Sequence, residues 1–142
     1  MNTEELTNKL KQCDDIDTFM EENANEFNED AFKEFLGSLL LKSKSNKTKL
    51  ATEIGMSTSY VSEIFRGDKT APGKDVLLRI AFGLKLALDE VNRLLVLGGK
   101  APLRSKLRRD AIVIYSIENG FSLAQVDDLL FHYNQPTITE LK

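Results

Sequence analysis

The chain has 142 residues, of which 42% are hydrophobic and 29% charged, and its formal net charge is −3. This composition is typical of one globular domain with a small appendage and excludes a disordered or collagen-like chain. One cysteine and one histidine exclude an internal disulfide and a cysteine-rich zinc site, and the lack of a signal pattern or of an apolar run near ~18 residues predicts a soluble cytoplasmic protein with no membrane contact.

Apolar residues recur at helical spacing along most of the chain, and no segment alternates as a strand would. Two short amphipathic helices are expected in the first 22 residues. The clearest apolar stripe follows in residues 31–41, where one helix face must be buried. Further helices are expected at residues 47–54, 57–66, about 74–84, 88–97, 104–118 and about 123–133. Residues 134–142 are expected to form a loose tail.

Capping residues and glycines mark several of these helix ends. Asn46 and Ser57 are expected to cap the helices that follow them. Gly55 stands just past a helix end, where a positive φ is often required. Ser122 and Gln125 have the spacing of a capping box, which predicts the start of the last helix.

Residues 47–67 are the most informative segment. Two short helices joined through Gly55-Met56-Ser57 predict a helix-turn-helix unit. In such a unit the second helix presents its first residues to base edges in the major groove of DNA. That helix needs a buried face, which Val61, Ile64 and Phe65 supply. Its outward or partly outward residues are small or polar: Thr58, Ser59, Tyr60, Ser62 and Glu63.

Charge is distributed unevenly along the chain. Residues 1–34 carry 11 acidic and 3 basic residues, residues 35–109 carry 6 acidic and 15 basic residues, and residues 110–142 carry 5 acidic residues and 1 basic residue. A basic middle between acidic ends favours a polyanion-binding core. The alternative is that these charges only solvate helix faces.

The segment KTKLATEIGMSTSYVSEIFRGDKTAP (residues 47–72) resembles the helix-turn-helix of the lambda-repressor and Cro-like family. The positions that match its fixed residues are Leu50, Ala51, Ile54, Gly55, Met56, Ser57, Val61, Ser62, Ile64, Gly67 and Pro72. With one helix before it and two after, the resemblance covers residues 31–97. It implies an all-α fold, in which a five-helix domain carries additional N-terminal and C-terminal helices packed on it.

The resemblance also implies roles for individual residues. Thr58 and Ser59, with Ser62 and Glu63 one turn later, stand at base-reading positions. The candidates for contact with the DNA backbone are Lys47, Lys49, Tyr60, Arg66, Lys69 and Lys74. For Tyr60 the alternative is ordinary partial burial.

Two positions depart from the family pattern. Lys85 stands where the family usually has glycine, so a left-handed or altered cap geometry is expected there. The reading helix has no Gln or Arg before Arg66, so direct bidentate recognition of bases is limited.

These patterns divide the chain into residues 1–30, an acidic helical extension; residues 31–99, the DNA-binding domain; and residues 100–142, a helical pair with a tail. After the domain, the pattern RRDAIVIYSIENGFSLAQVDDLL (residues 108–130) is similar to that of a group of bacterial proteins, which implies a bacterial or phage origin. The apolar run at residues 111–117 predicts core or a dimer surface.

We therefore expect a non-enzymatic, sequence-specific regulator of transcription that uses no cofactor or metal. Its expected partners are double-stranded DNA and a second copy of the chain, on half-sites about one helical turn apart. The alternative hypothesis is a protein–protein interaction module that uses the same fold to bind a protein partner.

Overall fold

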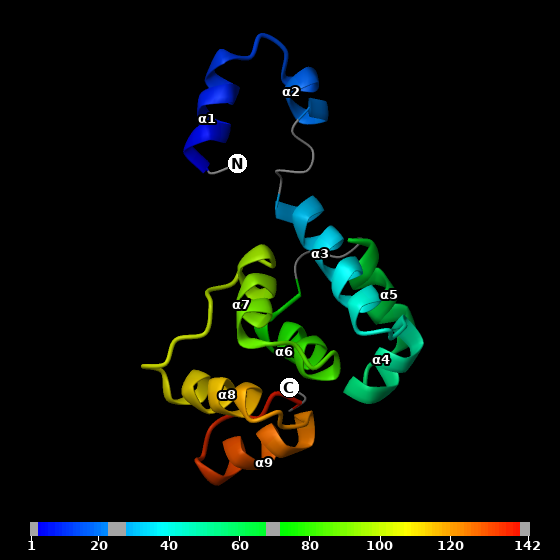
Figure 1. The fold of residues 1–142 in the computed structure, drawn as a ribbon, viewed down its shortest axis with the longest axis vertical. Helices are drawn as coiled ribbons and strands as arrows, with labels where there is room; N and C mark the ends of the chain where they lie inside the picture. The colour runs from blue at the N-terminus through cyan, green and yellow to red at the C-terminus, as the bar shows by residue number, and fades with distance from the viewer. Residues whose placement is uncertain (1–2, 23–27, 68–71, 140–142) are drawn as a thin grey trace.

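The computed structural model describes residues 3–22, 28–67 and 72–139. These residues form nine helices and contain no strand, which confirms the all-α prediction (Figure 1). The helices are α1 (Thr3–Gln12), α2 (Ile16–Glu22), α3 (Asn28–Lys42), α4 (Lys47–Ile54), α5 (Thr58–Arg66), α6 (Lys74–Gly83), α7 (Leu88–Leu97), α8 (Arg108–Glu118) and α9 (Leu123–His132).

Helices α3 to α7 surround one hydrophobic core. α4 packs against α5 and α6, and α3 packs against α5 and α7. Every one of the five helices contributes side chains that are almost completely buried, and each such side chain stabilises the fold by about 1.5–3 kcal/mol. The largest of them are Leu36, Leu50, Ile54, Val61, Leu77, Leu78, Ile80, Val91, Leu94 and Leu95. This is the five-helix arrangement that the resemblance implied.

Four helix connections share one turn design. A residue with positive φ is followed by one residue and then by the N-cap of the next helix. The positive-φ residues are Lys44 (54°), Gly55 (71°), Lys85 (55°) and Gly120 (66°). In each turn the next N–H donates to a carbonyl five residues earlier, as from Met56 to Ala51 at 3.0 Å and from Phe121 to Ser116 at 2.9 Å. The left-handed geometry expected at Lys85 is confirmed.

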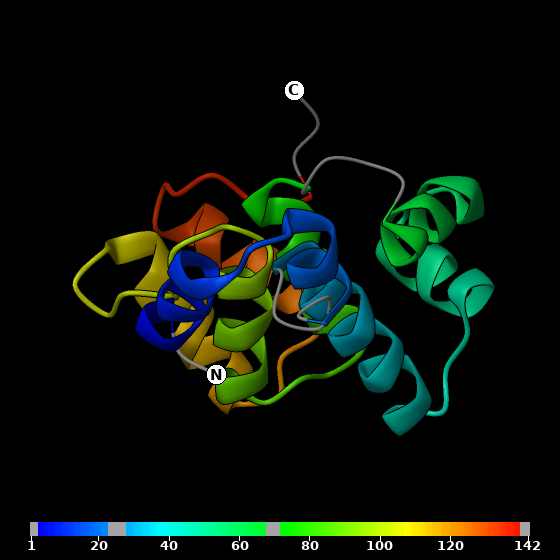
Figure 2. The ribbon, with the colours of Figure 1, turned by 90° about the horizontal axis from the view of Figure 1, so that it is seen from above.

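Helices α8 and α9 pack against each other, and they contact α7 and α6 respectively (Figures 1 and 2). The predicted capping box is present, since Ser122 Oγ accepts from Gln125 N at 3.2 Å and Gln125 Oε1 accepts from Ser122 N at 2.8 Å. Val113, Val126 and Leu130 are buried and join the main core.

Two expectations for this part of the chain are wrong. The helix predicted at residues 104–118 begins only at Arg108. The residues before it form a turn in which the Leu107 N–H donates to the Arg104 carbonyl at 3.0 Å, and the Arg104 N–H donates to the carboxylate of Asp110 at 3.0 Å. The predicted loose tail is packed as far as it is described. Ile138 is 1% exposed, and its N–H donates to Asp127 at 2.6 Å.

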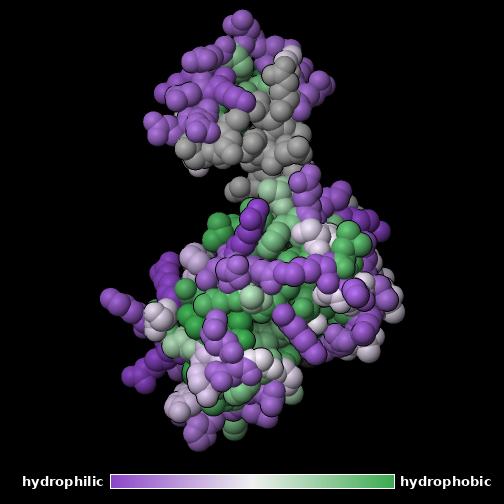
Figure 3. Space-filling model, in the orientation of Figure 1, coloured by the Kyte–Doolittle hydropathy of each residue, from purple (hydrophilic) through white to green (hydrophobic). Residues whose placement is uncertain are grey.

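Helices α1 and α2 contact each other, and Figure 1 shows them together at one end of the long axis. α1 buries none of its residues, whereas Phe19 of α2 is buried. The space-filling view shows mostly hydrophilic side chains on this pair (Figure 3). In the described residues no helix combines the length and the apolar character that a membrane crossing needs.

Candidate nucleic-acid interface

The reading unit, residues 47–67, comprises α4, a tight turn and α5. Asn46 Oδ1 accepts from Lys49 N at 2.8 Å and so caps α4, and Ser57 Oγ accepts from Tyr60 N at 3.1 Å and so caps α5. Gly55 links the two helices with φ at 71°. A Cβ at this position would meet no atom within 4 Å, so glycine is favoured here by backbone conformation and not by crowding.

Helix α5 has one buried face and one outward face. Val61, Ile64 and Phe65 are buried in the core. Thr58 and Ser59 are exposed, and Ser62 and Glu63 are partly exposed one turn later. Residues four positions apart lie above one another on a helix, and adjacent residues are turned by about 100°, so these four side chains span about 140° of the helix circumference. The four residues predicted to read bases therefore share one side of α5.

Tyr60 lies between the two faces. It is half-buried and packs against the core residues of the domain. This placement agrees with ordinary partial burial, which was the alternative to a role in backbone contact.

Basic side chains surround both ends of the reading unit. Lys47 is half-buried, and its Nζ lies 6.0 Å from the centroid of the Phe65 ring, at the limit of a cation–π contact. Lys49 and Arg66 are exposed. The predicted backbone contact at Lys69 falls outside the described residues.

Lys33 lies beside the end of α5, although no local pattern in the sequence predicted it. A Cβ added to Gly67 would lie 3.9 Å from the Lys33 Cδ atom. Lys33 belongs to α3 and was counted within the acidic first segment of the chain. Only the packing of α3 against α5 brings it to this surface.

Lys74 has a partner that the sequence did not reveal. Its Nζ lies 2.6 Å from Asp110 Oδ1, and the Asp110 side chain is 4% exposed. The neighbouring residues of the two helices form a second pair, in which Arg109 Nη1 lies 2.9 Å from Asp75 Oδ1. The start of α6 is thus joined to the start of α8 by two ion pairs. No spacing rule could find these contacts, because the partners are 36 and 34 residues apart.

A further ion pair fixes α3 against α7. Lys42 Nζ lies 2.8 Å from Glu90 Oε2, and Glu90 Oε1 accepts from Ala87 N at 3.0 Å. The hydrogen bond from Lys42, followed by the one from the Ala87 N–H, lowers the pKa of Glu90 below its ordinary value. The same pair raises the pKa of Lys42. In this arrangement the Lys42 charge stabilises the fold.

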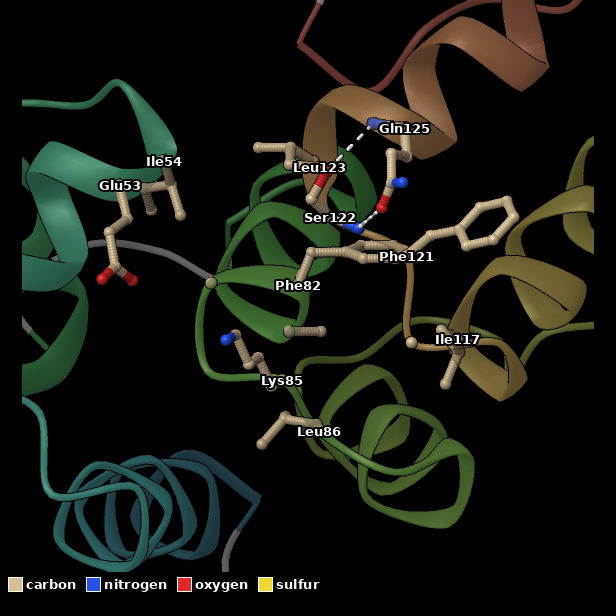
Figure 4. A pocket seen from close by; sticks show the side chains of 13 residues that line it. Glu53, Ile54, Phe82, Lys85, Leu86, Ile117, Phe121, Ser122, Leu123 and Gln125 are labelled. Atoms are coloured by element: carbon tan, nitrogen blue, oxygen red, sulfur yellow. Dashed lines mark hydrogen bonds between the residues drawn. The ribbon is translucent and has the colours of Figure 1, made fainter.

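A pocket of about 340 Å³ lies between the reading unit and the C-terminal helices (Figure 4). It is lined by the end of α4 at Glu53 and Ile54, by the α6–α7 turn and by the α8–α9 turn, and none of the predicted site residues lines it. Within the ranges that the structure describes, no group of three or more His, Cys, Asp or Glu side chains could hold a metal ion.

Comparison with protein families assigns this region. Residues 38–91 match the family model described as helix-turn-helix. The matched stretch starts within α3, ends within α7 and contains the whole reading unit. Residues 38–91 form a helix-turn-helix domain.

The match confirms the resemblance to the lambda-repressor and Cro-like type of helix-turn-helix. Domains of this family bind DNA, and the family is not one of enzymes. Comparison with curated proteins and with solved structures found no match for this chain.

Proposed function

We propose that this protein is a sequence-specific, DNA-binding regulator of transcription, of the bacterial or phage type. Residues 57–66 read the major groove. The observation that carries the proposal is the division of α5, whose one face is locked into the core while Thr58 and Ser59 are exposed at its start. A recognition helix is required to present its first residues to base edges in this way.

The side chains on the outward face of α5 can form single hydrogen bonds with base edges. The hydroxyls of Thr58, Ser59 and Ser62 can donate to or accept from base edges, and Glu63 can accept from the amino group of cytosine. None of these side chains makes the bidentate contact with guanine that arginine makes. We therefore expect modest sequence preference from each subunit.

The affinity in this proposal comes from phosphates. Lys47 and Lys49 lie in the first turn of α4, and Arg66 ends α5. Lys69 and Tyr60 are further candidates for phosphate contact. Lys74 is the weakest candidate for a phosphate contact, because its ammonium would first have to leave the buried carboxylate of Asp110. Phosphate contacts hold the protein on the duplex without selecting a sequence.

We further propose that two copies bind two half-sites about one helical turn apart. The DNA-binding domain in this proposal is residues 31–99, with residues 1–30 and 100–142 as additions. We place the contact between the two copies on the C-terminal helices, because these helices carry exposed aromatic residues. Phe131, for example, is 78% exposed.

Selection from random duplex DNA by the purified full chain tests the proposal. We expect the sequenced survivors to share a palindromic motif. Thr58→Ala with Ser59→Ala should flatten the preference, whereas Lys47→Ala should weaken binding to all sequences alike. The control is Thr7→Ala with Ser38→Ala, which removes two exposed hydroxyls outside the reading unit. Survivors without any shared motif would contradict sequence-specific recognition.

The second candidate function is a protein-interaction module. It is favoured by one observation, the acidic Glu63 on an α5 face that has no Gln or Arg before its last residue. No binding to any duplex at low salt would overturn the DNA proposal. Binding of a protein partner that Thr58→Ala with Ser59→Ala abolishes would then support this second function.

A further inference from the structure

A second basic surface lies where the chain enters α8. Arg104, Lys106 and Arg108 fall within five residues, and no acidic residue lies between Pro102 and Asp110. All three side chains are exposed. As far as the described residues go, none of the three makes a side-chain hydrogen bond or an ion pair. We call residues 104–108 the basic segment.

The basic segment is held firmly in place. On one side of it, the Leu103 N–H donates to Asn92 Oδ1 at 2.8 Å, and Leu103 is buried. The Arg104 N–H donates to Asp110 Oδ2 at 3.0 Å. Three exposed like charges on a fixed backbone repel one another, so they are most stable beside a polyanion.

One carboxylate places this segment beside the helix-turn-helix domain. Asp110 holds the Arg104 N–H on one oxygen and the Lys74 ammonium on the other. Within each of the pairs Lys74–Asp110 and Arg109–Asp75 the two charges cancel. The uncancelled positive charge at this junction is therefore that of the basic segment.

The arrangement of the helices shows where this charge lies relative to α5. Figures 1 and 2 both place α6 between α5 and the yellow segment that leads into α8. The basic segment thus extends the molecule beyond the start of α6, on the side away from α5. A phosphate that it contacted would lie outside the groove occupied by α5.

We propose that the basic segment binds DNA phosphates that flank the sequence read by α5. The inference rests on the proposed function, since it assumes that α5 is seated on a duplex. Duplex DNA carries one charge per about 1.7 Å of its axis, so phosphates are available to all three side chains. These contacts add affinity and lengthen the bound site without changing the selected motif.

The salt dependence of binding tests the inference. The dissociation constant of the selected duplex is measured against salt concentration for the wild type and for Arg104→Gln/Lys106→Gln/Arg108→Gln. Each lost phosphate contact reduces the slope of log K against log salt by about 0.9. We expect the variant slope to be smaller by about 2–3 per subunit, with the selected motif unchanged.

A matched variant controls for net charge. Lys9→Gln/Lys11→Gln/Lys85→Gln removes the same formal charge from exposed positions on α1 and in the α6–α7 turn, and it should keep the wild-type slope. A duplex trimmed to the selected motif provides a second comparison. On that duplex the wild type should bind no better than the basic-segment variant.

The outcomes separate the two proposals. If the wild type binds DNA with a steep slope but the basic-segment variant keeps it, the further inference is overturned and the proposed function stands. If the wild type shows no salt-dependent binding to any duplex, both are overturned. If the slope fell equally in the Lys9→Gln/Lys11→Gln/Lys85→Gln variant, the change would reflect net charge alone, and the inference would also be overturned.

Discussion

The helix pairs α4–α5 and α8–α9 have the same turn and different outward surfaces. Both turns place a glycine at positive φ, Gly55 at 71° and Gly120 at 66°. A buried or half-buried hydrophobic residue follows, and then a serine caps the next helix. The turn therefore specifies how two helices meet, and it carries no information about what the second helix binds.

The outward residues make the difference. Counted from the capping serines, Ser59 and Arg66 of α5 correspond to Ala124 and Phe131 of α9. The first helix offers a hydroxyl and a cation where the second offers a methyl and an exposed aromatic ring. For this reason the proposed function places the contacts with bases on α5 and not on α9.

The two pairs also differ in what holds them. The α4–α5 pair depends on caps, a glycine and core residues that lie close together in sequence. The α8–α9 pair depends on two carboxylates that bind other parts of the chain. Asp110 of α8 pairs with Lys74 at the start of α6, and Asp127 of α9 accepts the N–H of Ile138 in the tail. Substitutions should therefore affect the two pairs in different ways.

The largest expected effect is on the tail that covers the C-terminal helices. Because Ile138 is buried, Ile138→Ala should lower the free energy of unfolding by about 3 kcal/mol. Denaturant unfolding followed by circular dichroism measures the change. Pro136→Ala, at an exposed position of the same segment, is the control and should lower it by at most about 1 kcal/mol, through the added freedom of the unfolded chain. Equal effects of the two would mean that the tail is not packed.

The ion pair between α6 and α8 should give the next effect. Lys74→Met leaves the buried carboxylate of Asp110 without its cation. Breaking a fully buried pair costs 3–5 kcal/mol, and the partial exposure of Lys74 reduces the expected loss to about 2 kcal/mol. Combining it with Asp110→Asn should recover part of that loss in a double-mutant cycle. Lys49→Met, at an exposed site of α4, is the control. A coupling energy near zero would contradict the pairing.

The shared turn predicts equal costs in the two helix pairs. Gly55→Ala and Gly120→Ala should each lower the free energy of unfolding by about 1 kcal/mol, since both alanines would adopt positive φ. Gly37 lies within α3, and a Cβ added there would meet no atom within 4 Å. Gly37→Ala should therefore act in the opposite direction, by about 0.5–1 kcal/mol. A cost at Gly55 but none at Gly120 would mean that the two turns differ.

The smallest effect concerns the α6–α7 turn, which has Lys85 at positive φ. Here the group that caps the next helix is a carboxylate, Glu90, which can be protonated. Ala87 at the N-cap has no side-chain acceptor for the first N–H groups of α7, so of a capping box only the bond from the Ala87 N–H to Glu90 Oε1 is formed. Because the fold lowers the pKa of Glu90 from 4.5, its contribution to stability is present above that pH and is lost as the pH falls further.

Glu90→Gln should therefore destabilise the protein by about 1 kcal/mol or less at neutral pH. The difference from the wild type should shrink as the pH falls below 4.5, the ordinary pKa of this carboxyl. Thermal unfolding at several pH values measures it. A difference that stays constant with pH would show that the carboxylate charge is not involved.

Sequence reasoning succeeded where the determinants are local. The bounds of α4 and α5 follow from Asn46, Gly55 and Ser57, each of which acts within a few residues, and the helix-turn-helix was predicted from them. The start of α8 and the packed tail could not be predicted in this way. In each case one carboxylate, Asp110 or Asp127, accepts a backbone N–H from outside its own helix, and such a contact leaves no periodic pattern.

In the candidate site, too, local features could be predicted from the sequence and tertiary contacts could not. The outward position of Thr58 and Ser59 follows from helical spacing relative to a buried face, which the sequence contains. The approach of Lys33 to α5 and the pairing of Lys74 with Asp110 follow from tertiary packing. Charge counted along the sequence could not distinguish a cation at the surface from one that neutralises a buried carboxylate.

The most direct test of the central claim is to map which helix touches the bases. A thiol-reactive photo-cross-linker is attached at Ser59→Cys in a Cys13→Ser background and is irradiated on the selected duplex. The proposal that α5 reads the bases predicts cross-links from Ser59→Cys to bases within the selected motif, and none from the equivalent site on α9, Ala124→Cys. Cross-links from Ala124→Cys but not from Ser59→Cys, or none within the motif from either, would contradict it.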